Sequence, residues 1–148
     1  MIVLDKEATY KVLNHLLDNA VKFTASGSIR FGYEIKEKQI LFHVEDTGIG
    51  IPEGKEKEIF DLFRQGDLRL SRQFGGTGLG LAIAKRYVSA MNGQIWCSNN
   101  QSSARGATFK FSLPLLAASK NRTETLSQNS SGALTVAATT MISNDSLL

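Results

Sequence analysis

LLDNAVKFT (residues 16–24), DTGIGIP (residues 46–52) and GGTGLGLAI (residues 75–83) are the three stretches that decide the expected fold. The first places the amide of Asn19 and the ammonium of Lys22 on a predicted helix. The other two are glycine-rich turns, in which backbone N–H groups can come close to an anion. Together the three stretches predict a pocket for a magnesium nucleotide.

The composition suits one globular domain with a single core. The chain has 148 residues, of which 42% are hydrophobic and 21% are charged. Its net charge of +3 and pI of about 9.1 are only mildly basic, and no run of Lys or Arg occurs, which argues against nucleic acid as a partner. The single cysteine, Cys97, cannot form an internal disulfide, so an intracellular, reducing setting is expected.

Hydrophobic periodicity divides the chain into two parts. Residues 1–116 carry it, whereas residues 117–148 hold six Ser, five Thr, three Asn and no aromatic residue. Such a composition buries too little apolar surface to offset the entropy lost on ordering, so residues 117–148 are predicted to be a flexible tail or linker. No apolar stretch is long enough to span a bilayer, and no direct membrane contact is expected.

Local patterns predict helices on one face of a mixed, mainly antiparallel sheet, which is a two-layer α/β sandwich of the α+β type. Asp5 is a candidate N-cap for a first helix that runs to about Phe23. Its apolar stripe consists of Leu13, Leu16, Leu17 and Ala20. The other predicted elements are a hairpin (29–35 and 40–45), a short helix (55–63), a helix (79–91) stopped by Asn92 and Gly93, and two strands (94–98 and 107–113). Four further side chains are expected to pack in the core: Phe60, Phe63, Trp96 and Cys97.

A second stripe of the first helix lies beside the apolar one and carries His15, Asn19, Lys22 and Phe23. The carboxamide oxygen of Asn19 could bind Mg²⁺, which prefers hard oxygen donors and takes its other ligands from water and phosphate. An ordinary surface asparagine is the alternative. The presence of Lys22 on the same stripe favours the metal.

Asp46 ends a predicted strand and precedes Gly48 and Gly50. A carboxylate fixed at this point could accept a hydrogen bond from the amino group of adenine. An ordinary strand-to-loop turn is the alternative, because Asp-Thr-Gly is common turn material. The company of the other two stretches favours the adenine site.

Gly76, Gly78 and Gly80 open the helix that follows, and its N-terminal amides would favour phosphate. The turn is neither a Walker A loop nor a dinucleotide motif. Thr77 could add a hydroxyl group to the nucleotide contacts. Residues 66–76 are polar and aperiodic, which predicts a mobile loop. Three arginines could neutralise phosphate charge there: Arg64, Arg69 and Arg72.

Residues 1–116 resemble the catalytic ATP-binding domain of sensor histidine kinases, within the superfamily that includes gyrase, Hsp90 and MutL. The residues within these motifs most resemble those of large sensor kinases that often carry an attached receiver domain. The resemblance implies a Bergerat-type sandwich, ATP and Mg²⁺ as ligands, and an ATP lid over residues 53–75. The matching motifs are the N box (15–24), the G1 box (46–51), the F box (60–63) and the G2 box (76–81).

This resemblance implies a role for each matching residue. Asn19 would be the metal ligand, Lys22 a phosphate contact and Asp46 the adenine acceptor. His15, Asn19 and Lys22 form the implied catalytic set. The implied nucleotide-binding residues are Asn19, Lys22, Phe23, Asp46, Gly48, Gly50, Ile51, Gly76, Thr77, Gly78, Leu79 and Gly80.

His15 departs from the family pattern. Members usually have an asparagine one helical turn before the metal-binding one, and gyrase-like relatives have a catalytic glutamate there. The absence of that glutamate argues against an ATPase that activates water. His15 could orient the incoming nucleophile, bind a water of the metal, or fill space.

The leading hypothesis is an enzyme module of two-component signalling that presents the γ-phosphate of Mg-ATP to a histidine on a separate dimerisation domain. A response-regulator receiver domain would be the second partner, and the expected location is the cytoplasm, as part of a sensor that other segments could anchor in a membrane. Neither His15 nor His43 precedes an acid, as the family's phosphoacceptor does, so the isolated chain is expected to bind ATP without phosphorylating itself. The alternatives are a degenerate ATP-sensing module and a serine kinase of the anti-sigma-factor type.

Overall fold

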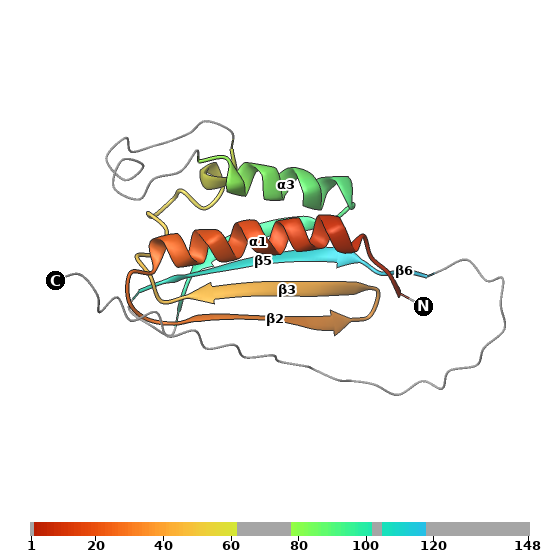
Figure 1. The fold of residues 1–148 in the computed structure, drawn as a ribbon, viewed down its shortest axis with the longest axis horizontal. Helices are drawn as coiled ribbons and strands as arrows, with labels where there is room; N and C mark the ends of the chain where they lie inside the picture. The colour runs from red at the N-terminus through yellow and green to blue at the C-terminus, as the bar shows by residue number, and fades with distance from the viewer. Residues whose placement is uncertain (1, 62–77, 102–104, 118–148) are drawn as a thin grey trace.

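The computed structural model describes residues 2–61, 78–101 and 105–117. In it, two helices cover one face of a four-stranded sheet (Figure 1). The helices are α1 (Lys6–Phe23) and α3 (Gly80–Ala90). The sheet has the order β2-β3-β5-β4, formed by Ile29–Lys36, Gln39–Asp46, Ala107–Pro114 and Gln94–Asn99. The predicted two-layer sandwich is confirmed. Each neighbouring pair in this sheet is antiparallel, so the described strands contain no parallel pair of the kind that a mixed sheet would have.

The first helix forms as its sequence predicts. The side chain of Asp5 caps it by accepting a hydrogen bond from the backbone N–H of Ala8 at 2.9 Å. Val12, Leu16 and Ala20 are buried against the sheet because they recur on one helical face. Leu13 and Leu17, which the predicted stripe also contained, are only partly buried at the edge of this core.

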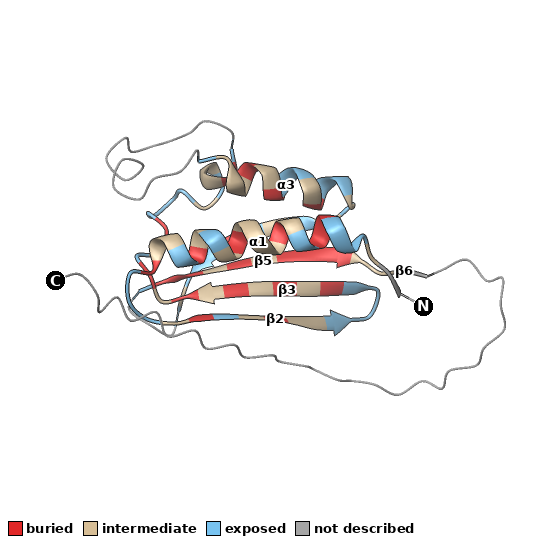
Figure 2. Cartoon of the chain, viewed as in Figure 1, coloured by how far each residue is buried: buried red, intermediate tan, exposed pale blue. Residues whose placement is uncertain are grey.

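The core lies between the helices and the two central strands, as Figure 2 shows by the buried residues along β3 and β5. Alternate residues of β3 point toward the helices, and the register places Phe42 opposite Phe111. These two rings stack with centroids 4.6 Å apart. Aromatic and β-branched pairs of this kind hold the sheet in one register.

The second helix ends where Asn92 and Gly93 predict. Asn92 adopts a φ of 56°, and the N–H of Gly93 donates to the carbonyl oxygen of Val88 at 2.9 Å. This arrangement is a left-handed helix stop. It returns the chain into β4.

Two local predictions differ from the structure. The helix expected over residues 55–63 is only a short 3-10 turn, Glu58–Phe60, within the described residues. Trp96 was expected in the core but is 40% exposed, because it pairs with Lys110 on the face of the sheet that the helices leave uncovered. Phe60 and Cys97 are buried as predicted, and Phe63 lies outside the described residues.

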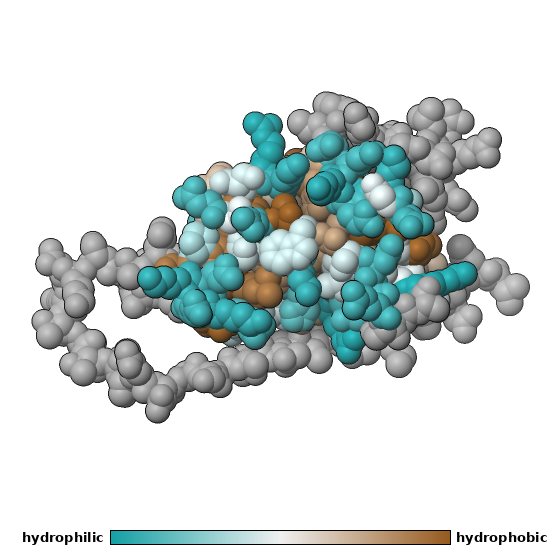
Figure 3. Space-filling model, turned by 180° about the vertical axis from the view of Figure 1, so that it is seen from behind, coloured by the Kyte–Doolittle hydropathy of each residue, from teal (hydrophilic) through white to brown (hydrophobic). Residues whose placement is uncertain are grey.

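A second, two-stranded sheet joins the beginning and the end of the described chain. Its strands, β1 (Ile2–Val3) and β6 (Leu116–Ala117), pair in antiparallel fashion. No pattern in the sequence predicts this pairing. Apart from Ala117, which is part of β6, the predicted tail (residues 117–148) lies outside the described residues. No helix within the described parts is both long and apolar enough to cross a membrane. Figure 3 shows the back of the molecule, where hydrophilic side chains are interspersed with hydrophobic ones.

Candidate functional site

Asp46 is a buried carboxylate at the end of β3. It is 3% exposed, and its Oδ1 accepts hydrogen bonds from the backbone N–H of Gly48 at 2.9 Å and of Ala107 at 3.3 Å. Its second oxygen, Oδ2, accepts no hydrogen bond from any described residue. This oxygen is also not fully buried, so it can be reached from outside. One oxygen therefore fixes the side chain, and the other remains free for a ligand.

Burial raises the pKa of the Asp46 carboxyl above its ordinary value, and the charge of Glu45 acts in the same direction. The N–H groups of Gly48 and Ala107 oppose this shift because they stabilise the ionised form. The charged carboxylate is therefore kept at some expense of folding stability. A buried ionisable group with a shifted pKa is typical of a binding or catalytic site.

Gly48 lets the turn after Asp46 pack directly on the end of α1. A Cβ at this position would collide with the carbonyl oxygen of Phe23. The same carbonyl accepts a hydrogen bond from the N–H of Ile49 at 3.2 Å. The predicted N and G1 boxes, which are distant in sequence, are thus brought into contact.

Thr24 follows directly on α1 and carries an unsatisfied hydroxyl group. The residue is 4% exposed, and its Oγ1 has no hydrogen-bond partner among the described residues. A Cβ at Gly48 would lie 2.8 Å from this atom. Such an orphaned polar atom at the junction of the two motifs is expected where a ligand or water completes the site.

The polar stripe of α1 is present and leaves its charged and amide groups unpaired. The side chains of Asn19 and Lys22 make no hydrogen bond or ion pair with described residues, and the ammonium of Lys22 lies 5.2 Å from the ring centroid of Phe23. His15 faces the beginning of α3, since a Cβ at Gly80 would lie 3.4 Å from its Nδ1. Asn19 and Lys22 are therefore available to an outside ligand.

The beginning of α3 supplies the part of the G2 box that the structure describes. Gly78 has a φ of 67°, and Leu79 caps the helix without a side-chain hydrogen bond. Among the described residues, no side chain accepts a hydrogen bond from the first N–H groups of the helix, which favours a nearby anion. Gly76, Thr77, the three candidate arginines (Arg64, Arg69 and Arg72) and most of the predicted lid lie outside the described residues.

Two asparagines that the motif analysis did not single out hold the G1 turn in place. Asn99 bonds to both backbone polar groups of Ile51, and the side-chain amide of Asn100 donates to the carbonyl oxygen of Asp46. Gly50, with a φ of 77°, allows the close approach of Asn99. A pair of asparagines at the end of a predicted strand was the only available sequence signal.

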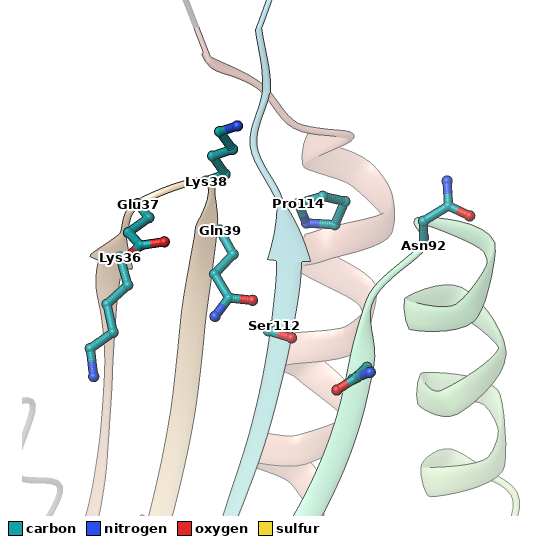
Figure 4. A pocket seen from close by; sticks show the side chains of 8 residues that line it. Lys36, Glu37, Lys38, Gln39, Asn92, Ser112 and Pro114 are labelled. Carbon is teal, nitrogen blue, oxygen red and sulfur yellow. The ribbon is translucent and has the colours of Figure 1, made fainter.

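Hollows lie at both ends of the sheet. A cavity of about 220 Å³ adjoins the G1 turn and is lined by Ile49, Gly50, Ile51, Asn99, Asn100, Arg105 and Gly106. A larger one of about 700 Å³ lies at the opposite end, beside the turn between β2 and β3. Figure 4 shows its lining, in which the exposed side chains of Lys36 and Lys38 point in different directions. The larger cavity contains none of the predicted site residues.

The available ligands fit magnesium bound mainly through a nucleotide. Within the described residues, no group of three or more His, Cys, Asp and Glu side chains could hold a metal ion. The unpaired amide of Asn19 is a hard oxygen donor, and the unpaired ammonium of Lys22 can neutralise phosphate. This donor set suits a metal whose remaining ligands come from phosphate and water.

Comparison with known families supports a nucleotide as the ligand. The family described as Histidine kinase-, DNA gyrase B-, and HSP90-like ATPase matches residues 4–117. The chain is 43% identical over 114 residues to the sensor histidine kinase AruS of Pseudomonas aeruginosa, covering 74% of this chain and 11% of that protein. It is 37% identical over 116 residues to the sensor histidine kinase WalK of Bacillus subtilis, covering 76% of this chain and 19% of that protein. The chain therefore spans less than a fifth of these relatives.

Solved structures show the same fold. The full-length ShkA structure in complex with AMPPNP superposes with a TM-score of 0.68 and 32% identity, covering 79% of this chain and 23% of that one. The mycobacterial sensor histidine kinase MprB gives a TM-score of 0.63 and 26% identity, covering 77% of this chain and 74% of that one. Both comparisons cover the two-layer sandwich described above.

Proposed function

The chain belongs to the histidine kinase-, DNA gyrase B- and HSP90-like ATPase family, as a catalytic domain of the sensor histidine kinase type, and we propose that it binds Mg-ATP for phosphorylation of a histidine. The acceptor histidine would lie on a separate dimerisation domain. The observation that carries this proposal is the buried carboxylate of Asp46, which is fixed through one oxygen and free at the other. The AMPPNP in the related ShkA structure supports the same class of ligand.

We assign the ends of the nucleotide to opposite sides of this site. Asp46 Oδ2 would accept a hydrogen bond from the adenine amino group, and Gly48 and Gly50 keep the turn close enough for that contact. Asn19 would hold the magnesium ion, and Lys22 and the N-terminus of α3, with Gly78, Leu79 and Gly80, would face the phosphates. When bound, the metal supplies charge neutralisation on the phosphate oxygens.

Catalysis would then consist mainly of positioning and charge stabilisation. Lys22 would counter the charge of the γ-phosphoryl group, and His15, one turn before Asn19, would orient the attacking imidazole. Phe23 ends α1 and Ile51 ends the turn that begins at Asp46, and both would border the nucleotide. Gly76 and Thr77 complete the proposed set of contacts.

Magnesium provides a direct test of this assignment. Asn19→Ala should weaken the binding of Mg-ATP about tenfold and leave the binding of adenosine unchanged, because only the metal-dependent part of the affinity depends on the amide. Isothermal titration calorimetry measures both affinities. Equal losses for the two ligands would contradict the role of Asn19 and indicate a damaged fold.

A second candidate function is an ATP-sensing module without phosphotransfer. It is favoured by His15, which stands where the family usually has an asparagine and packs against Gly80. Reconstitution with the acceptor domain of the parent protein distinguishes the two: phosphate appears on the acceptor only if the chain is a kinase. The chain alone should bind ATP without becoming phosphorylated.

The proposed partners follow from the proposed histidine kinase function. The dimerisation domain would supply the histidine, and a receiver domain of a response regulator would accept the phosphoryl group afterwards. Among the relatives, proteins named as a sensory/regulatory protein of Xanthomonas campestris and a hybrid signal transduction protein of Dictyostelium discoideum are each 43% identical to this chain over the aligned region. We place this domain in the cytoplasm.

A further inference from the structure

We propose that Asn99 and Asn100 are positioning residues that hold the adenine-binding turn, residues 46–51, in its binding conformation before the nucleotide arrives. The inference rests on the proposed function, because it concerns how the same site is prepared. Both asparagines act on the main chain of the turn. Neither is part of the motifs that first indicated the site.

Asn99 binds the end of the turn as a strand neighbour would. Its Oδ1 accepts a hydrogen bond from the N–H of Ile51 at 2.7 Å, and its Nδ2 donates to the carbonyl oxygen of the same residue at 2.8 Å. A primary amide carries an acceptor oxygen and a donor NH₂ group side by side, so it can satisfy one backbone donor and one backbone acceptor of the same residue. Ile51 is thereby fixed on β4, although it belongs to no strand itself.

Asn100 binds the beginning of the turn. Its Nδ2 donates to the carbonyl oxygen of Asp46 at 2.8 Å, and its Oδ1 accepts a hydrogen bond from the hydroxyl of Thr108 at 2.6 Å. The contact with Thr108 orients the amide so that its NH₂ group faces Asp46. The backbone N–H of Asn100 also donates to Gly106 at 3.1 Å, and a Cβ at Gly106 would collide with the carbonyl oxygen of Asp46.

These bonds matter for binding because a free turn would have to be ordered by the nucleotide. The turn contains Gly48 and Gly50, which have large conformational freedom in an unrestrained chain. Ordering it in advance removes that cost from the binding step. Asn100 acts directly on the residue whose carboxylate would meet adenine, so its effect should depend on that carboxylate.

Affinity for adenosine and ADP, measured by NMR titration, tests the proposal. Asn99→Ala and Asn100→Ala should each weaken the binding of both ligands by about fivefold, because part of the cost of ordering the turn would then fall on the binding step. Ser98→Ala is the matched control, because Ser98 is exposed on the same strand and makes no side-chain hydrogen bond with described residues. In Asn99→Ala, hydrogen exchange should also accelerate at the N–H of Ile51.

A double-mutant cycle separates positioning from a general loss of stability. In an Asp46→Asn background, Asn100→Ala should change the affinity for adenosine by less than about twofold, because the contact that it positions is already lost. An equal loss in both backgrounds, or affinities in both single variants equal to that of Ser98→Ala, would overturn the positioning role. If the unmodified chain binds neither adenosine nor ADP, the proposed function itself is wrong.

Discussion

The two ends of the four-stranded sheet differ in a way that separates a binding site from a surface hollow. At one end, the cavity of about 220 Å³ is lined by part of the turn that the buried Asp46 begins, and side-chain amides hold this turn. At the other end, the cavity is about 700 Å³, and Lys36, Glu37, Lys38 and Gln39 in its lining are exposed.

Volume is therefore a poor guide to function in this fold. Desolvating a polar group is unfavourable. The burial of Asp46 with one free oxygen, and of Thr24 with an unsatisfied hydroxyl group, therefore needs an explanation such as a ligand. Exposed lysines at the larger cavity require no such explanation, because water satisfies them. Each prediction below tests this difference between the two ends.

The largest effect is expected from Gly48→Ala. Its new Cβ would collide with the carbonyl oxygen of Phe23 and separate the G1 turn from α1, which should lower the free energy of unfolding by about 3 kcal/mol. Gly54→Ala is the control, because Gly54 has a φ of 77° but no atom within 4 Å of its Cβ position, and only about 1 kcal/mol should be lost. Urea denaturation measures both. Equal losses would contradict the steric role of Gly48.

Asp46→Asn should affect binding and stability in opposite directions. The amide can still accept the hydrogen bonds of Gly48 and Ala107 but would present NH₂ to adenine in place of Oδ2, which should weaken ADP binding about 100-fold, or about 2.7 kcal/mol. The melting temperature without nucleotide should stay the same or rise, because no charge is buried. Calorimetry and thermal denaturation together test this pair of outcomes, and a lower melting temperature with unchanged affinity would make Asp46 purely structural.

The pH dependence of stability and of adenosine affinity should both reflect the protonation of Asp46. Because its folded pKa is raised above 3.8 by burial, its contribution to stability is complete below the unfolded pKa and is lost as pH rises through the folded pKa. Affinity for adenosine should change in the other direction and fall as acid protonates the carboxylate. Titrations from about pH 4 to pH 7 should show this fall in the native chain and a flat profile in Asp46→Asn. The same profile in both proteins would contradict the assignment.

The smallest effect is expected at the larger cavity. Lys38→Ala and Gln39→Ala should each change the free energy of unfolding by less than about 0.5 kcal/mol and leave the affinity for ADP unchanged, because both side chains are exposed. Denaturation and calorimetry provide the two values. A marked loss of nucleotide affinity in either variant would place function at the end of the sheet that we regard as a surface hollow.

The parts of the fold that sequence predicted are those controlled by local patterns. The cap at Asp5, the stop at Asn92 and the alternation along β3 each depend on a few neighbouring residues. Trp96 was misplaced because alternation along β4 identifies two faces but does not show which face the helices cover. The helix over 55–63 was overestimated because an apolar cluster around Ile59 and Phe60 fits a single turn as well as a longer helix.

The candidate site shows the same division between local patterns and long-range contacts. Asp46, Gly48 and Asn19 belong to short motifs, so their types and spacing were visible in the sequence. Asn99 and Asn100 act on residues 48 and 54 positions away, through amide contacts with the main chain. Such contacts produce no periodicity and require no particular neighbour, so the three-dimensional structure was needed to reveal them.

The pairing of β1 with β6 has a mechanical consequence. Because Ile2 lies opposite Ala117, segments attached before and after this pair leave the domain at one corner (Figure 1). A pull between those segments would load the strand pair one hydrogen bond at a time and peel it open, as in a zipper, whereas strands pulled lengthwise in shear share the load. Tension applied through such segments would therefore open this corner first. The turn around Asp46, at the opposite end of the sheet, would be protected from it.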